Sequence, residues 1–169
     1  MKFIKPKKLQ KGDTIGIISP SWGGPEFFPH IYENGISVLE EMGFKIKEFP
    51  TTRAHPDFLH ENPELRSNDV NAAFQDEEVS AIITSIGGDD SIRILPYIDD
   101  EIIKSNPKIL MGYSDTTILL TYVNQLGLIT FNGPAVMAGF SQMRKFPKAM
   151  EHFKDVLTRT REKHEYQPY

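Results

Sequence analysis

The stretch that decides the fold is residues 108–117, KILMGYSDTT. It opens with an apolar run, Ile109 to Met111, which is short enough for a buried strand and is followed directly by Gly112. Residues 118–123, ILLTYV, then have the composition of a buried or amphipathic helix. A strand that turns sharply into a helix with a serine at the turn is the geometry of a nucleophile elbow. Such a turn would project the Ser114 hydroxyl away from the sheet, beside a helix N-terminus that favours negative charge.

The pattern around Ser114 departs from the usual one at a single position. A nucleophile elbow is expected to read Gly-x-Ser-x-Gly, and Thr116 stands where the second glycine would be. The alternative interpretation is that Ser114 or Asp115 simply caps the helix, because both residue types are favourable N-caps. The residues of this stretch alone leave both interpretations open.

The composition is that of an ordinary globular domain. The chain has 169 residues and a net charge of −4, which allows a core of its own and argues against a protein that binds nucleic-acid backbones. It has no cysteine, which excludes disulfides, thiolate metal sites and a cysteine nucleophile. Residues 1–13 lack the pattern of a signal peptide, and no apolar run approaches the length of a membrane span. We therefore expect a cytoplasmic protein.

The rest of the chain alternates between predicted strands and helices. Strands are predicted at residues 13–19, 45–49, 80–86 and 128–131, and helices at 30–42, 63–75, 92–95 and 147–160. The stretch 19–25 and the stretch 51–63 are predicted as loops. The second of these holds two histidines and two carboxylates, but their spacing matches no standard metal-ligand pattern, so we interpret it as a solvated loop. This alternation predicts an α/β domain with a mostly parallel sheet and helices on both faces.

In such a sheet the loops after Ser19, Ile86 and Met111 lie at the same edge. The loop after Ile86 begins with Gly87-Gly88, whose backbone is free to lie close to a ligand and to face an anion with its N–H groups. Read alone, the glycine pair is also typical of a plain turn.

The glycine loop and the elbow together indicate hydrolytic chemistry. A nucleophilic serine needs two N–H donors to stabilise the oxyanion that forms on the attacked carbonyl. The residue after the serine, Asp115, supplies one donor, and Gly88 on the neighbouring loop is placed to supply the other.

Several segments of the chain resemble the LD-carboxypeptidase family of serine peptidases, and within it the microcin C immunity branch. They occur in the family's order and are residues 12–16 (GDTIG), 19–21 (SPS), 72–76 (AAFQD), 81–83 (AII), 87–91 (GGDDS), 112–117 (GYSDTT) and 132–137 (NGPAVM). Each match is modest, but together they are specific, and the resemblance extends from residue 11 to about residue 157.

The resemblance implies a flavodoxin-like or class I glutamine amidotransferase-like three-layer domain, the amino-terminal half of a two-domain enzyme. It implies Ser114 as the nucleophile and the N–H groups of Gly88 and Asp115 as the oxyanion hole, with no metal or cofactor. The family hydrolyses amide bonds, either of murein peptides ending in D-alanine or of aminoacyl and peptidyl nucleotides of the microcin C type. The sequence after the glycines looks more like the second branch. The candidates for substrate binding are Gly87, Asp89, Asp90 and Ser91.

The family's triad is not matched in full. Its Glu and His follow the serine in the second half, whereas His152 and His164 of this chain lie in contexts that do not resemble the family's histidine motif. We therefore expect residues 1–160 to be the nucleophile-bearing domain and 161–169 to be a tail or the start of a linker to a missing carboxy-terminal domain. We expect the chain alone to be inactive, because a serine without its base is a poor nucleophile. The resemblance also implies a homodimer that binds a small peptide or aminoacyl nucleotide, and neither nucleic acid nor a membrane.

Two other functional classes remain as alternatives. One is a non-catalytic α/β module in which Gly87-Gly88 and the helix at Asp115 hold a carboxylate. The other is a class I amidotransferase-like relative, which would carry a cysteine at the elbow and is disfavoured because the chain has none. The nucleophile hypothesis predicts that Ser114 lies at a strained turn near Gly88. It also predicts an open surface, or one covered by a partner, around Ser114, Trp22 and Pro134.

Overall fold

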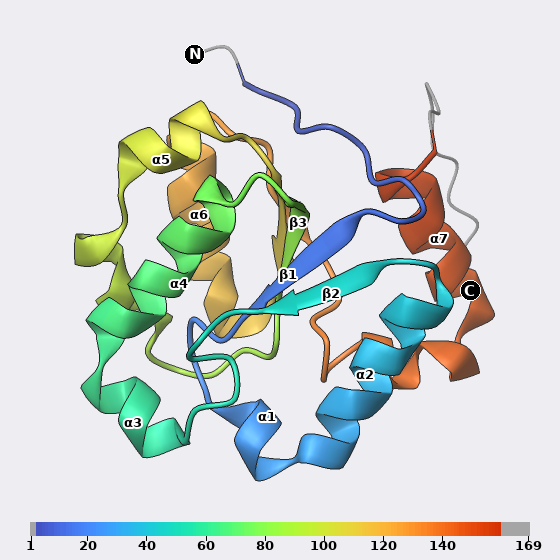
Figure 1. Ribbon diagram of the computed structural model, residues 1–169, viewed down its shortest axis with the longest axis horizontal. Helices are drawn as coiled ribbons and strands as arrows, with labels where there is room; N and C mark the ends of the chain where they lie inside the picture. Colours follow the sequence, from blue (N-terminus) through green and yellow to red (C-terminus); the bar gives the residue numbers. More distant parts are fainter. Residues whose placement is uncertain (1–2, 160–169) are drawn as a thin grey trace.

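A computed structural model of the chain describes residues 3–159 (Figure 1). The strands are β1 (Thr14–Ile18), β2 (Lys45–Glu48), β3 (Val79–Thr84), β4 (Ile109–Gly112) and β5 (Phe131–Asn132). The α-helices are α1 (Gly24–Phe27), α2 (Pro29–Glu41), α3 (Pro56–Glu61), α4 (Pro63–Gln75), α5 (Asp100–Ser105), α6 (Thr117–Gln125) and α7 (Pro147–Leu157). Three 3-10 helices join them: η1 (Ser91–Tyr97), η2 (Ser114–Thr116) and η3 (Phe140–Lys145).

Within the described residues the strands form one parallel five-stranded sheet in the order β2-β1-β3-β4-β5. The register pairs Ile17 of β1 with Ile83 of β3, and Ile82 of β3 with Leu110 of β4. The chain order reverses between β1 and β3, and in open α/β sheets such a switch point, at the carboxyl ends of the strands, is where ligands bind. Helices α1 and α3, which follow β1 and β2, mark this edge at the bottom of Figure 1.

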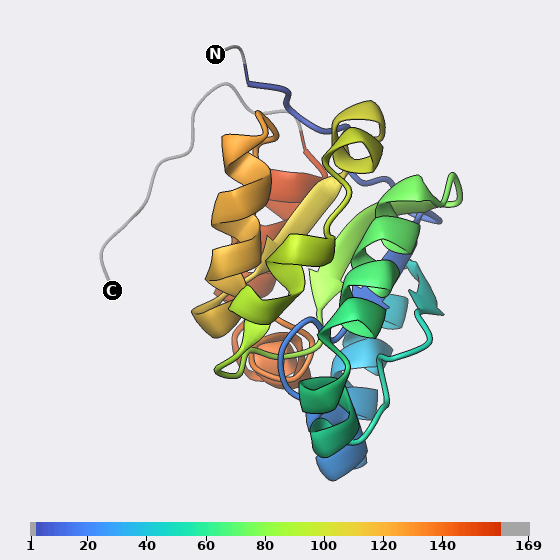
Figure 2. The same ribbon diagram turned by 90° about the vertical axis from the view of Figure 1, so that its left-hand side faces the viewer.

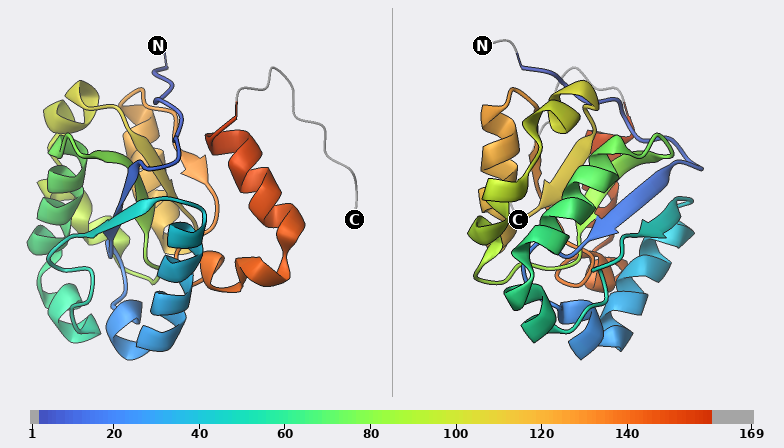
Figure 3. Two further views of the ribbon diagram at one scale, coloured as in Figure 1. Left: turned by 45° about the vertical axis from the view of Figure 1, so that its right-hand side comes forward. Right: turned by 60° about the vertical axis from the view of Figure 1, so that its left-hand side comes forward.

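Helices cover both faces of the sheet, as Figures 1 and 2 show. Side chains alternate along each strand, so Ile83 and Met111 enter one core while Ile82 and Leu110 enter the other. The first core lies against α2, η3 and α7, and the second against α4, α5, α6 and η1. The predicted α/β class, with a parallel sheet between two helical layers, is confirmed. The two views in Figure 3 show α7 and α2 on the side of the sheet opposite α4 and α6.

Proline and glycine set the bounds of several helices. Helices α2, α3, α4 and α7 each begin with a proline, whose fixed φ suits the first helical position and whose missing N–H would have no partner there. Gly43 and Gly127 follow α2 and α6 with φ of +94° and +97°, a conformation that only glycine adopts without strain. The bounds predicted for α2 and α4 agree with the structure to within one residue.

The predicted loops contain more structure than expected. The first loop, at residues 19–25, runs into the short helix α1, and the stretch predicted as a solvated loop, 51–63, holds α3 together with the buried Thr51 and Thr52. Helix α5 was not predicted, and the last strand consists of Phe131–Asn132 rather than 128–131. Leu128 instead forms an isolated bridge to Ile4. These elements are short, and their apolar residues are too few to show a period in the sequence.

The end of the last predicted helix and the predicted tail lie outside the described residues. Helix α7 ends at Leu157, whereas the prediction ran to Thr160, and both residues 161–169 and His164 fall beyond the part that the structure describes. In residues 3–159, none of the helices combines the length and apolar character needed to cross a membrane.

Candidate active site

Ser114 occupies a strained turn between β4 and η2. Its φ is +63°, and it is the one non-glycine residue with positive φ in the described part of the chain. An L-residue in this left-handed region is strained by crowding of its Cβ against the backbone, and such strain gathers at functional sites. The side chain is exposed, and the turn precedes the helical residues of η2 and α6. The predicted position of Ser114, at a strained strand-to-helix turn, is therefore confirmed.

The glycine loop after β3 lies directly against this turn. A Cβ added to Gly87 would come within 2.9 Å of Ser114 Cβ, 3.0 Å of Ser114 Oγ and 3.4 Å of the Asp115 nitrogen. Because consecutive Cα atoms are about 3.8 Å apart, Gly88 is also close to the turn, as predicted. Gly87 is buried and Gly88 is exposed, and the close approach to Ser114 falls on Gly87.

The departure at Thr116 has a structural explanation. The close approach at the elbow falls on Gly112, where a Cβ would lie 2.5 Å from Thr84 Oγ1 and 2.7 Å from Thr116 Oγ1. Thr116 is fully buried, and its hydroxyl donates to the Tyr113 carbonyl at 2.8 Å across the turn. The first glycine of the pattern is therefore required by space, while threonine at the last position stabilises the turn with a hydrogen bond.

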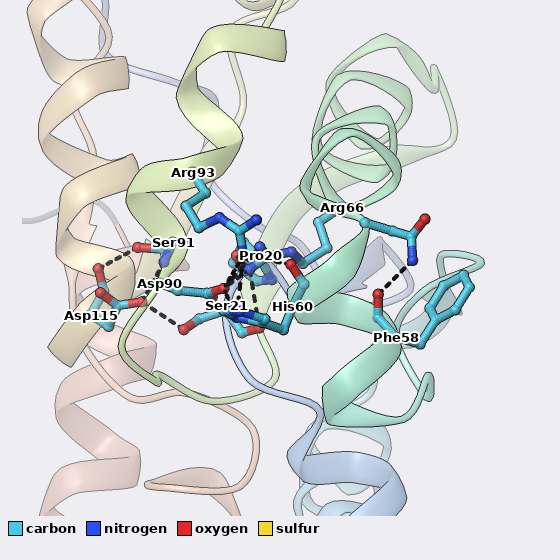
Figure 4. A network of polar contacts seen from close by, with 10 residues as sticks. Pro20, Ser21, Phe58, His60, Arg66, Asp90, Ser91, Arg93 and Asp115 are labelled. Atoms are coloured by element: carbon cyan, nitrogen blue, oxygen red, sulfur yellow. Dashed lines mark hydrogen bonds and ion pairs between the residues drawn. The ribbon is translucent and has the colours of Figure 1, made fainter.

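The side chain of Asp115 holds the elbow to both neighbouring loops. Its Oδ2 accepts from the Ser21 hydroxyl at 2.6 Å and from the Ser91 N–H at 2.8 Å, while the Ser91 hydroxyl donates to the Asp115 carbonyl at 2.8 Å (Figure 4). Neither Ser114 nor Asp115 forms a side-chain cap on η2 or α6. The capping alternative is therefore not what the structure shows, and the Asp115 carboxylate instead fixes the position of its own backbone.

Two N–H groups are placed beside Ser114. The Asp115 N–H belongs to the first turn of a helical segment, where N–H groups have no carbonyl within the helix to bond. The Gly88 N–H belongs to the exposed neighbouring loop. An oxyanion hole requires two N–H donors that are fixed before reaction and aimed at one point, and that these two groups form one stays a prediction.

Arg66 of α4 supports the site from beneath. It is fully buried, and its Nη1 donates to the carbonyls of Pro20 and Ser21 at 2.9 and 3.2 Å and to Asp90 Oδ1 at 2.7 Å. Its Nη2 donates to Asp90 Oδ2 at 3.2 Å. Figure 4 shows these contacts converging on the guanidinium. A buried arginine is stable only when paired and hydrogen-bonded, and here the loops after β1 and β3 provide the partners.

Asp90 is the centre of a wider charged cluster. Besides Arg66, its carboxylate contacts His60 Nδ1 at 2.9 Å and Arg93 Nη1 at 3.4 Å. Burial raises the pKa of the Asp90 carboxyl, but the hydrogen bonds and positive charge of Arg66, aided by His60, outweigh burial and hold the pKa below its usual value. The carboxylate therefore stays ionised at neutral pH.

The four candidates for substrate binding occupy different environments. Asp89 is exposed beside Gly88, Gly87 packs on Ser114, and Asp90 and Ser91 form the internal contacts described above. Ser91 is fully buried. Contact of these residues with a substrate remains a prediction, and Asp89 is the one whose side chain is most open to solvent.

Of the three histidines that precede the elbow, His30 lies on α2, whereas His55 and His60 lie in the second predicted loop. The His55 ring accepts from the Asp57 N–H at 3.2 Å and caps α3, while His60 belongs to the Asp90 cluster. In the same segment Thr51 donates to buried Asp69, whose pKa is raised by burial despite these hydrogen bonds. No group of three or more potential metal ligands occurs in residues 3–159.

The surface around the site is open and partly apolar. Trp22 is half-buried, and its ring packs with the exposed rings of Phe27 and Phe28 at centroid distances of 5.7 and 6.1 Å. Beyond Tyr113 a cavity of about 1170 Å³ opens between β5 and α7, lined in part by Pro134. Of the residues predicted to be open, Ser114 is exposed, while Trp22 and Pro134 are half-buried.

Sequence reasoning missed Arg66 and the role of Ser21. The signal for Arg66 is its helical position, because residues 66, 67, 69, 70, 73 and 74 form the buried side of α4, and Arg66 and Asp69 are the charged residues among them. A charged residue in the apolar face of a helix indicates a buried partner. The partner itself, Asp90, is 24 residues away and has no local signature.

Comparison with known proteins places the chain in a family. Residues 15–133 match the profile of the LD-carboxypeptidase N-terminal domain. The chain belongs to this family. It is 34% identical to the "Probable murein peptide carboxypeptidase" of Bacillus subtilis over 92% of this chain and 48% of the relative. It is also 34% identical to the microcin self-immunity protein MccF of Escherichia coli, over 89% of this chain and 44% of the relative.

Solved structures of this LD-carboxypeptidase family show the same fold. MccF in complex with aspartyl sulfamoyl adenosine superimposes with a TM-score of 0.85 at 33% identity, covering 93% of this chain and 48% of MccF. The chain thus spans about half the length of the relatives it matches. The resemblance read from the sequence segments is confirmed.

Proposed function

We propose that Ser114 is the nucleophile of a serine-type amide hydrolase and that this chain supplies its nucleophile-bearing domain. The observation that carries the proposal is the conformation of Ser114, an exposed serine at φ +63° pressed against Gly87 at the carboxyl edge of the sheet. A serine that served only as a connector would have no reason to occupy a strained conformation, and glycine would fit the turn at lower cost.

In the proposed reaction Ser114 Oγ attacks the carbonyl carbon of an amide. The hydroxyl proton passes to a base, and the carbonyl oxygen becomes an oxyanion that accepts from the N–H groups of Gly88 and Asp115. The C–N bond then breaks, the amine leaves with the proton, and water hydrolyses the resulting ester of Ser114. By family resemblance, the base is a His of a carboxy-terminal domain and its partner is a Glu of the same domain. Among residues 3–159 no hydrogen bond joins Ser114 to a histidine.

We propose an aminoacyl or peptidyl amide as the substrate. The names of the relatives support this class, since one is named for murein peptides and the solved structure of MccF holds an aminoacyl sulfamoyl adenosine. Other MccF structures hold AMP or glutamyl sulfamoyl guanosine. The sequence after the glycines favours the nucleotide conjugate over the murein peptide. We also propose that the protein is cytoplasmic and forms a homodimer, as the family resemblance suggests.

A fluorophosphonate probe on the full-length protein tests the proposal. The probe phosphorylates an activated serine, so mass spectrometry of the digested protein should find the adduct on Ser114. A Ser114→Ala variant should remain unlabelled under the same conditions. Ser37→Ala is the matched control, since Ser37 lies on α2 away from the site and its removal should leave labelling unchanged. An unlabelled wild-type protein would favour the alternative of a non-catalytic ligand-binding module.

A further inference from the structure

Arg66 bridges the two loops that surround the elbow. Its guanidinium donates at once to the Pro20 and Ser21 carbonyls, on the loop after β1, and to both carboxylate oxygens of Asp90, on the loop after β3 (Figure 4). The side chain is fully buried, so it is held in this arrangement by packing as well as by its bonds. A planar guanidinium can serve several acceptors in different directions, whereas a lysine ammonium at the end of a flexible stem cannot reproduce that fork.

Ser21 passes this restraint to both proposed oxyanion donors. Its carbonyl accepts from Arg66, and its hydroxyl donates to Asp115 Oδ2 at 2.6 Å. Gly88 lies against the same residue, because a Cβ added to Gly88 would fall 2.1 Å from Ser21 Oγ. A shift of Ser21 would therefore disturb the position of both Asp115 and Gly88.

We propose that Arg66 is a positioning residue that fixes the oxyanion hole, an inference that rests on the proposed function of Ser114. It touches neither Ser114 nor the substrate, and acts by holding Ser21 and Asp90 so that the Gly88 and Asp115 N–H groups converge. A misplacement of about 1 Å in a catalytic group can lower the rate by about a hundredfold. Loss of Arg66 should therefore reduce the acylation rate of Ser114 far more than it weakens substrate binding.

The alternative is that Arg66 serves stability alone. Removing one member of a buried ion pair leaves the other unpaired and destabilises a protein, whereas replacing both members by apolar residues is often neutral. A double variant, Arg66→Met with Asp90→Leu, separates the two roles. If stability were the whole effect, the double variant would recover both stability and rate. If Arg66 positions the loops, it recovers stability but not rate.

The test uses the full-length protein and the rate of fluorophosphonate labelling of Ser114. The variants are Arg66→Lys, Arg66→Met and the double variant, each checked for folding by circular dichroism and thermal melting. Arg144→Met is the matched control, because Arg144 makes an exposed pair with Glu41 at 2.7 Å on η3 and α2. Hydrogen–deuterium exchange of residues 19–23 and 86–91 gives a second measurement that does not depend on labelling.

We expect each Arg66 variant, including the double variant, to label at least about tenfold more slowly, with a saturation constant for the probe within about threefold of wild type. Exchange in both loops should rise, and Arg144→Met should match wild type in both measurements. Wild-type labelling rates in Arg66→Lys or in the double variant would overturn the inference and leave the proposed function intact. If the wild-type protein is not labelled at Ser114, the proposed function fails. Hydrogen–deuterium exchange then tests separately whether Arg66 orders the two loops. Unchanged exchange in Arg66→Met would overturn that role of Arg66 as well.

Discussion

Replacing Ser114 by glycine should stabilise the protein relative to replacing it by alanine. The backbone at this position has φ +63°, which costs an L-residue about 1–2 kcal/mol. Both substitutions remove the hydroxyl, which makes no hydrogen bond to other described residues, so the two variants differ mainly in backbone strain. Glycine relieves that strain but loses more entropy on folding, by about 0.5–1 kcal/mol. With the midpoints of the two ranges, the difference should favour Ser114→Gly by about 0.75 kcal/mol.

Chemical denaturation followed by circular dichroism measures this difference directly. For a domain of this size, a change of 1 kcal/mol also shifts the melting temperature by about 2–4 °C, so thermal melts give an independent check. The matched control is Ser37, which lies within helix α2 at an ordinary helical position. There the order should reverse, with Ser37→Gly less stable than Ser37→Ala by up to about 1 kcal/mol. Neither Ser114 variant should react with a fluorophosphonate. If Ser114→Gly were no more stable than Ser114→Ala while the Ser37 pair behaved as expected, the strain argument for Ser114 would be refuted.

Three further predictions concern the same edge of the sheet. Gly87→Ala should slow labelling of Ser114 about a hundredfold, because the new methyl group would lie 3.0 Å from Ser114 Oγ. The control is Gly133→Ala, whose methyl group would meet the flexible Met111 side chain at 3.1 Å and which should label within about threefold of wild type. Equal labelling rates for the two variants would contradict the close contact between Gly87 and Ser114. The pKa of the Asp90 carboxyl is lowered in the folded state, so the stability that this carboxylate contributes is complete above the ordinary pKa of 3.8 and is lost as the pH falls through the folded-state pKa. Urea denaturation should therefore show a smaller loss of stability below about pH 4 in Asp90→Asn than in the wild-type protein. The 169-residue chain by itself should release no product from an aminoacyl sulfamoyl adenosine or a murein tetrapeptide in a chromatographic assay, because no histidine in residues 3–159 is hydrogen-bonded to Ser114, and turnover that depends on Ser114 would reveal a base within the chain.

The sequence predicts the sheet and the elbow because both depend on local patterns. An apolar run followed by Gly112, a polar turn and a second apolar segment is sufficient to predict a strand, an elbow and a helix. The order of strands and helices then predicts a parallel sheet and places the loop after β3 beside the elbow. These inferences need only the periods of strands and helices and the handedness of their connections, which are general properties of polypeptides.

The buried hydrogen bonds in and around the site could not be predicted in the same way. The hydrogen bond between Ser21 and Asp115 joins residues 94 positions apart, and the bond between Thr51 and Asp69 joins residues 18 apart. Each of these residue types is ordinary in a loop or at a helix start, so nothing in its neighbourhood indicates that it will be buried. Only the whole fold determines which polar side chains meet, and for that reason the sequence alone predicts a solvated loop at Thr51.

The polar groups of the site divide into an exposed set and a buried set. Ser114 and Gly88 face solvent, while Ser21, Ser91 and Arg66 are buried and bonded within the protein. Arg66 is a costly choice for stability, since its Nε has no hydrogen-bond partner in the described residues and apolar side chains fill such positions at least as well. What an arginine provides there, and an apolar residue does not, is a fixed relation between two loops. A strained serine persists only where its surroundings hold it in place. The buried set is therefore best understood as the structure that keeps Ser114 and its neighbouring N–H groups in one arrangement.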